Sequence, residues 1–419
     1  MNTLSYVHID ARGTYASILV AILLALVAAP FDVFAAKKPA ATAAFEYYAE
    51  GSPEINNGQR IPLTPHGPSY VLMGGGPDVD EAFRWMIKRA GIQPGTGGRL
   101  VILRAWGKDD YNPYILYGDS NKKIDSTTPS ADGWVGGGAL GLTSVETVVV
   151  ASRAAADSAE LVRYFERANA VFIAGGDQGN FIRFWKGTRL SLALDRLIAA
   201  NVPIGGTSAG LAVLGGFDFA ALNDTISSAE ALVNPFDSRM TIDPATPDAA
   251  DPANAALTLT GGFITPPVFS NVIFDSHLDS RNRMGRLVGF VSRLVEQSRS
   301  GTAGCTGGVL SASVARGVGV SVETALLVGG TAKGRGYSYS AQRVTNVSTT
   351  SESAVYFVDF LLDPTACAVG APLSVPSSSI AIRKLADSTL IVDFDTLREL
   401  PVYQYNGVSS GVLDNPNWY

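Results

Sequence analysis

The chain has 419 residues, of which 46% are hydrophobic and 17% are charged, and it contains 44 glycines. This composition favours a compact, loop-rich α/β protein of one large domain or two, and it is not that of a coiled coil or a disordered chain. The formal net charge is -6 and no basic run occurs, so the electrostatic signature of a nucleic-acid-binding protein is absent.

The N-terminus has the pattern of an export signal. Arg12 precedes an apolar run over residues 16–29, and residues 33–35 supply a cleavage site. We therefore expect residues 1–35 to be a signal peptide and the mature protein to be secreted or periplasmic. The alternative is an uncleaved anchor helix, although the run is short for a membrane span. Residues 36–66 are rich in Ala, Pro and Gly and are predicted to form an irregular lead-in.

Short apolar strands then alternate with amphipathic helices. Strands are expected at residues 69–73, 100–103, 145–150 and 170–174, and ahead of residue 206, with helices at 78–90, 157–167 and 190–199 between them. This alternation predicts a doubly wound, mostly parallel sheet flanked by helices. Ligands bind beyond the carboxyl ends of the strands in such sheets, so the loops that follow the strands are where a site is expected.

Two insertions interrupt this pattern, and the end of the chain has a different one. Polar or Ala/Asp/Pro-rich insertions are predicted at residues 109–130 and 243–256, and further elements at 272–274, 284–296, 317–322 and 324–328. From residue 331 on, Ser/Thr-rich segments alternate as in β-strands, for example at 354–360 and 389–394. We therefore expect an α/β domain over residues 67–330, which a β-rich C-terminal segment over 331–419 completes or extends.

Residues 206–210, Gly-Thr-Ser-Ala-Gly, fit the G-x-S-x-G pattern of a nucleophile elbow. The turn brings neighbouring backbone so close to the serine that only small residues fit beside it. The helix that follows offers N–H groups to a developing oxyanion. Ser208 is therefore a candidate nucleophile, and the alternative is an ordinary glycine-rich turn.

A serine nucleophile needs a general base, which is usually histidine. The sequence has three histidines, and only His277 directly follows a predicted strand. A carboxylate should orient the base. Glu323, at a strand end, is our choice, while Glu296 and Asp359 stay open as alternatives.

Arg281, Arg283 and Arg286 follow the candidate base at spacings of two and three residues. Arginine binds carboxylates in a bidentate manner, so three arginines beside one histidine predict a site for acidic groups. The alternative from spacing alone is a solvated helix face that carries Arg283 and Arg286.

The sequence indicates no metal and no nucleotide cofactor. It has no Walker loop, no H-E-x-x-H and no cysteine pair at metal-binding spacing, and its G-x-G-x-x-G run at residues 136–141 does not follow a strand. Cys305 and Cys367 either form one disulfide in an oxidising compartment or stay two buried thiols.

Together these motifs resemble the cyanophycinases, serine peptidases related to the aspartyl dipeptidases on a glutamine-amidotransferase-like α/β fold. The resemblance spans roughly residues 69–328. The matching residues are Gly74–Gly76, Gly175–Gln178, Gly206–Gly210, Asp275 and His277 with the three arginines, and Glu323 ahead of an Ala-Leu-Leu segment. The chain departs from the family at two positions: Ser276 stands where Gln is common, and Val322 stands where Asp is common. These departures bear on the identity of the substrate and not on the hydrolysis itself.

The resemblance implies a role for each residue. Ser208 would be the nucleophile, His277 the general base and Glu323 the residue that orients it. Backbone N–H groups of Gly176 and Ala209 would form the oxyanion hole. The substrate would be held by Gln178, Asp275, Arg281, Arg283 and Arg286. No cofactor is implied, and a homodimer is a further expectation because the family is often dimeric.

Cyanophycinases cleave cyanophycin, a polyaspartate chain with arginine on each β-carboxyl, to β-aspartyl-arginine dipeptides through an acyl-enzyme. The sequence therefore predicts an exported serine peptidase that acts on a polypeptide rich in aspartate and arginine. One alternative is a secreted aspartyl or isoaspartyl peptidase with a different acidic substrate. Another is a catalytically silent amidotransferase-like binding domain, against which the intact Ser208 and His277 argue.

Overall fold

The computed structural model describes residues 45–118, 133–245, 263–298, 301, 303–346, 349 and 353–419. All of them belong to the unit Ala43–Tyr419. The predicted signal peptide lies outside the described residues, as do parts of both predicted insertions. None of the helices within these ranges is long and apolar enough to cross a membrane.

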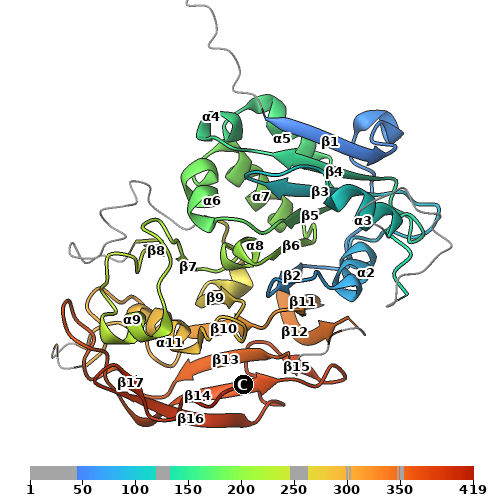
Figure 1. The fold of residues 1–419 in the computed structure, drawn as a ribbon. Coiled ribbons are helices and arrows are strands. Elements are labelled where there is room, and N and C mark those ends of the chain that lie inside the picture. Colours follow the sequence, from blue (N-terminus) through green and yellow to red (C-terminus); the bar gives the residue numbers. More distant parts are fainter. Residues whose placement is uncertain are drawn as a thin grey trace, which may run out of the picture. The chain divides into compact units, whose positions relative to one another are not determined.

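A mixed sheet, nine-stranded within the described residues, runs through the centre of this unit (Figure 1). In spatial order its strands are β1 (Glu46–Gly51), β4 (Ser144–Val149), β3 (Arg99–Arg104), β5 (Ala170–Ile173), β6 (Ile204–Thr207), β2 (Ser69–Met73), β11 (Thr324–Lys333), β12 (Gly336–Thr345) and β15 (Ile391–Asp393). The strands from β4 to β2 are parallel, and antiparallel strands flank them on both sides. The predicted α/β class with a mostly parallel sheet is confirmed.

Helices cover both faces of this sheet, because its central strands are apolar on both sides. The helices of the described residues are α2 (Asp80–Arg89), α3 (Tyr111–Tyr117), α4 (Arg153–Ala156), α5 (Ala159–Glu166), α6 (Gln178–Trp185), α7 (Arg189–Ala199), α8 (Ala209–Ala212), α9 (Ser228–Val233) and α11 (Met284–Leu294), with single 3-10 turns at Ile55–Gly58 and Pro267–Phe269. Of these, α9 and α11 pack with a second sheet and not with this one. In β2, Val71 and Met73 pack in one core with α2 and α3, whereas Tyr70 and Leu72 pack in another with α5, α6 and α7. This alternation follows from the two-residue period of a strand.

A second sheet holds most of the C-terminal segment (Figure 1). Its order is β17 (Val412–Leu413), β16 (Val402–Ser409), β14 (Val375–Leu385), β13 (Val355–Phe360), β10 (Arg316–Val320) and β9 (Val272–Ser276). β9 and β10 are parallel and the other pairs are antiparallel. Helix α11 packs on this sheet, and Leu287 and Val291 share a core with Ile380 and Ile382. Cys305 and Cys367 form a disulfide within the same core.

The structure differs from the sequence-based expectation at several elements. β1 lies in the predicted irregular lead-in, and its half-exposed side chains form no apolar run because it is an edge strand. β9 and β10 join the second sheet and not the main one. β11 runs through residue 330, where we expected the α/β domain to end and the β-rich C-terminal segment to begin. It pairs with β2. A short hairpin of β7 (Asp218–Phe219) and β8 (Ile242–Asp243) was not anticipated.

Candidate active site

The chain turns sharply at Ser208, between the end of β6 and the start of α8. Ser208 has φ 54° and ψ -115°, a conformation that non-glycine residues rarely adopt. A Cβ at Gly206 would lie 2.3 Å from the carbonyl oxygen of Gly210, and a Cβ at Gly210 would lie 2.1 Å from that of Ile173. Close backbone packing around the serine therefore requires both glycines.

His277 follows β9 and faces the serine. Its imidazole Nε2 lies 2.8 Å from Oγ of Ser208. The ring lies against the backbone of Gly75, where a Cβ would be 2.4 Å from Cε1 and 2.5 Å from Nε2. The missing side chain at Gly75 therefore leaves the space through which the imidazole reaches the serine.

Glu323 lies in the turn between β10 and β11, and its carboxylate makes no hydrogen bond to the imidazole. Within the described residues, Nδ1 of His277 has no hydrogen-bond partner. Of the other acids left open, Asp359 is paired with Arg316 and Arg383. The orienting role of Glu323 stays a prediction.

The end of β2 brings all three residues together through its backbone. Three successive carbonyl oxygens, those of Met73, Gly74 and Gly75, each accept one backbone N–H. The donors are Ser208 at 3.0 Å, His277 at 2.8 Å and Glu323 at 2.9 Å. All three donors have a positive φ, at 54°, 51° and 53°. One strand end thus anchors three loops in strained conformations, which cluster at active sites.

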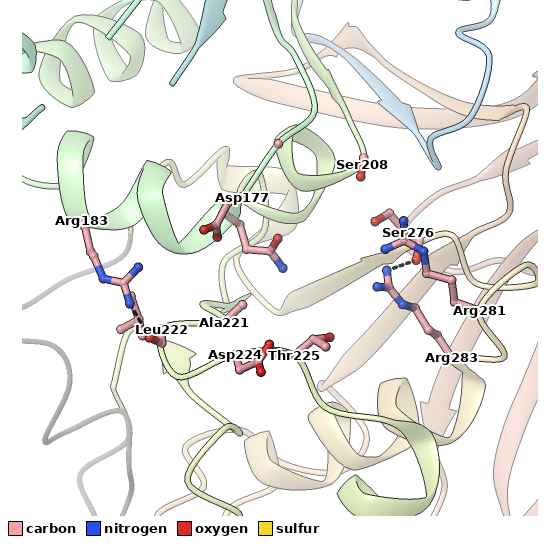
Figure 2. Close-up of a pocket in the computed structure, with 12 residues that line it drawn as sticks. Asp177, Arg183, Ser208, Ala221, Leu222, Asp224, Thr225, Ser276, Arg281 and Arg283 are labelled. Atoms are coloured by element: carbon pink, nitrogen blue, oxygen red, sulfur yellow. Dashed lines mark hydrogen bonds between the residues drawn. The ribbon is translucent and has the colours of Figure 1, made fainter. Parts of the chain in front are cut away.

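Ser208 opens into a pocket of ≈ 370 Å³ (Figure 2). Figure 2 shows Arg281 and Arg283 on the side of Ser276, with Asp177 and Arg183 across the pocket. The charged lining residues are Asp177, Arg183, Asp224, Arg281 and Arg283. The pocket therefore presents both signs of charge.

The residues predicted to hold the substrate fall into two groups. Gln178, Arg281 and Arg283 line the pocket. Arg283 donates to the carbonyl oxygen of Ser276 at 2.8 Å, whereas the guanidinium of Arg281 has no partner among the described residues.

Asp275 and Arg286 do not line the pocket, contrary to the expectation that they contact the substrate. Nε and Nη2 of Arg286 donate to the two carboxylate oxygens of Asp275 at 2.7 Å and 2.6 Å. The exposed fractions of the two residues are 3% and 2%. Each side chain neutralises the other, so this bidentate pair supports the site from within.

The predicted oxyanion donors lie on either side of the serine. Gly176 lines the pocket, and Ala209 is the first residue of α8. Neither backbone N–H donates a hydrogen bond to a described residue. Both are therefore available to a substrate oxygen.

Comparison with known protein families finds a match for part of the chain. The model of Peptidase family S51 matches residues 138–229, a segment that contains the turn at Ser208 and ends before His277. This segment of the chain is similar to peptidase family S51.

Two curated relatives named cyanophycinase, from Synechococcus elongatus and Thermosynechococcus vestitus, are distant homologues. Each is 29% identical over 154 residues, which cover 36% of this chain and 39% of the relative. The chain thus matches about two fifths of the length of these relatives. The solved structure of a peptidase from an acI-B1 Actinobacterium covers 73% of this chain and 96% of its own, at 15% identity and a TM-score of 0.39.

The surroundings of His277 determine the protonation state of its imidazole. Burial first, and then the charges of Arg281 and Arg283, lower the pKa of His277 to about 4. Asp275 and Asp279 act in the opposite direction but do not offset this. The imidazole is therefore neutral at neutral pH and can accept a proton from the serine.

Some residues that line the pocket were given no role in the sequence analysis. Asp177 caps α6, because its Oδ1 accepts the N–H of Gly179 at 2.8 Å. Its place in the Gly-Gly-Asp-Gln run after a strand was the available signal. Asp224 and Thr225 come from the segment after β7 and belong to no motif. Among the described residues, no group of three or more His, Cys, Asp or Glu could hold a metal ion.

Proposed function

We propose that Ser208 is the nucleophile of a serine peptidase and that His277 is its general base. The observation that carries this proposal is the 2.8 Å contact between Oγ and Nε2 at a pocket, with the imidazole neutral. As Oγ attacks the peptide carbonyl, His277 takes the hydroxyl proton and then gives it to the leaving amine. Water hydrolyses the resulting acyl-enzyme. The N–H groups of Gly176 and Ala209 stabilise the oxyanion in this proposal.

We propose cyanophycin as the substrate, with release of β-aspartyl-arginine. The distant relatives named cyanophycinase support this, and so does the mixed charge of the pocket. The guanidinium of Arg281 can bind an aspartate carboxylate, while Asp177 and Asp224 can bind the arginine of the same repeat. If the protein were instead an aspartyl or isoaspartyl peptidase with another acidic substrate, Arg281 would bind the substrate carboxylate and no acidic residue would be needed.

We also propose that the protein is exported and that the mature chain begins near residue 36. The disulfide between Cys305 and Cys367 supports this, because disulfides persist in oxidising compartments. Expression in the native host with N-terminal sequencing of the cell-free fraction tests the proposal. A full-length chain retained in the cytoplasm would contradict it.

Two assays test the catalytic proposal. The purified protein is treated with a fluorophosphonate probe, and it is also incubated with cyanophycin granules while soluble dipeptide is measured. We expect labelling and dipeptide release, both lost in Ser208→Ala. Ser276→Ala is the matched control for labelling, because Ser276 lines the same pocket without contacting the imidazole. Absence of labelling in the wild type would refute the enzyme, whereas labelling without dipeptide release would refute only the substrate.

A further inference from the structure

A buried cluster of one lysine and two aspartates lies outside the catalytic machinery. Lys186 follows α6, and Asp218 and Asp243 lie on β7 and β8. Their exposed fractions are 1%, 1% and 0%. Asp218 is directly opposite Asp243 in the antiparallel pair, so both carboxyl groups project from the same face of the hairpin. Nζ of Lys186 donates to Oδ1 of Asp243.

Among the described residues, Asp218 forms no ion pair of its own. Both carboxyl oxygens of Asp218 and Oδ2 of Asp243 lack hydrogen-bond partners among the described residues. Burial first, and then the charge of Asp243, raise the pKa of Asp218 well above its ordinary value, while the charge of Lys186 acts in the opposite direction. The raised pKa favours the neutral form of Asp218, which lies beside the buried ion pair of Lys186 and Asp243. Buried polar atoms without hydrogen bonds are costly, so this arrangement calls for an explanation.

We propose that Lys186 and Asp243 become joined by an intramolecular isopeptide bond, with Asp218 as the proton shuttle. Transfer of one proton from the ammonium to the carboxylate makes a neutral amine and a neutral acid, which a water-free interior favours over the ion pair. Nζ then attacks Cγ of Asp243, and the Cγ–Nζ bond forms.

In the proposed reaction, Asp218 donates one proton and takes up another. Its hydroxyl donates a proton to an oxygen of Asp243, which polarises Cγ and turns that oxygen into a leaving group. Asp218 recovers a proton from the attacking nitrogen as the Cγ–O bond breaks. The ammonium and the carboxylate thus yield one amide and one water molecule, with no oxidant or co-reactant. Asp218 returns to its starting state.

The bond would fix two walls of the catalytic pocket. Helix α6 begins with Gln178 at the pocket and ends next to Lys186. The hairpin that holds Asp243 leads from β7 into Ala221 and Leu222 of the same pocket. A covalent link between Lys186 and Asp243 would therefore hold the helix and the hairpin in one relative position, without contact to the substrate.

Peptide mapping of the full-length wild-type protein tests the proposal. The protein is reduced, alkylated, denatured and digested with trypsin. We expect no cleavage after Lys186, and a branched peptide that contains Lys186 and Asp243 and lacks the mass of one water molecule. Cleavage after Lys186, with linear peptides only, would overturn the proposal. This readout does not depend on peptidase activity or on the folding of any variant.

Two variants separate the bond from the shuttle. Lys186→Arg keeps the cation but cannot form this amide, so all its peptides should be linear. Asp218→Asn keeps the shape but cannot relay the proton, so the branched peptide should be lost or greatly reduced. Labelling of Ser208 by the fluorophosphonate probe checks that each variant is folded. A branched peptide at wild-type yield in Asp218→Asn would overturn the role of Asp218.

Discussion

Gly75→Ala tests whether the backbone of the β2 strand end positions the catalytic base. A Cβ at this position would lie 2.4 Å from Cε1 and 2.5 Å from Nε2 of His277. Carbon atoms normally approach to about 3.5 Å, so the imidazole must withdraw by about 1 Å. Withdrawal of Nε2 from its 2.8 Å contact with Oγ of Ser208 disrupts the proton transfer.

The magnitude follows from this displacement. A misplacement of about 1 Å at a reacting group costs about 100-fold in rate, which we expect in kcat. Gly75 also has φ +100°, which L side chains rarely adopt. The added backbone strain is about 1–2 kcal/mol and should lower Tm by a few degrees.

Gly76→Ala is the matched control. Gly76 has φ +84°, so the backbone strain is similar, but its Cβ would meet Val322 at 3.4 Å and would not approach the imidazole. The rate of serine phosphonylation by the fluorophosphonate probe and Tm are measured for both variants. We expect similar losses of Tm in both and a slower phosphonylation in Gly75→Ala alone. If Gly75→Ala is phosphonylated as fast as Gly76→Ala, the reasoning about the imidazole is wrong.

Two further predictions concern the base. The acidic limb of the kcat/KM profile should lie near pH 4, well below the ordinary histidine pKa of 6.5. Arg281→Gln should move this limb to higher pH, because loss of a neighbouring cation favours the imidazolium. A wild-type limb near pH 6.5, or a shift to lower pH in the variant, would contradict the argument from burial and charge. Glu323→Gln should lower kcat by no more than about tenfold, because its carboxylate is not bonded to His277, whereas loss of a bonded acid costs about 10⁴-fold. A loss as large as that of Ser208→Ala would show instead that Glu323 binds the imidazole during turnover.

The parallel strands and the candidate nucleophile and base could be predicted because their signals are local. β2 and β3 are continuous apolar runs, and Ser208 lies in a spaced motif. The pairing of Asp275 with Arg286 could not be predicted, because the sequence shows which charges exist and not which of them meet. The same holds for β9 and β10: their apolar patterns indicate strands, but only packing decides which sheet they join. β1 gave too weak a signal, since an edge strand needs no apolar run.

The backbone of β2 explains why the site tolerates three strained residues. A buried N–H must find an acceptor, and each of the three strained residues gives its N–H to one of three consecutive carbonyls, from Met73 to Gly75. A side chain at Gly74 would lie 1.9 Å from the carbonyl oxygen of Ser321, so this approach requires glycine as well. Positive φ at Ser208, His277 and Glu323 is therefore stabilised by one common template. The loop of Glu323 is thus held at the same strand end as the candidate nucleophile Ser208 and the candidate base His277, although its carboxylate is not bonded to the imidazole.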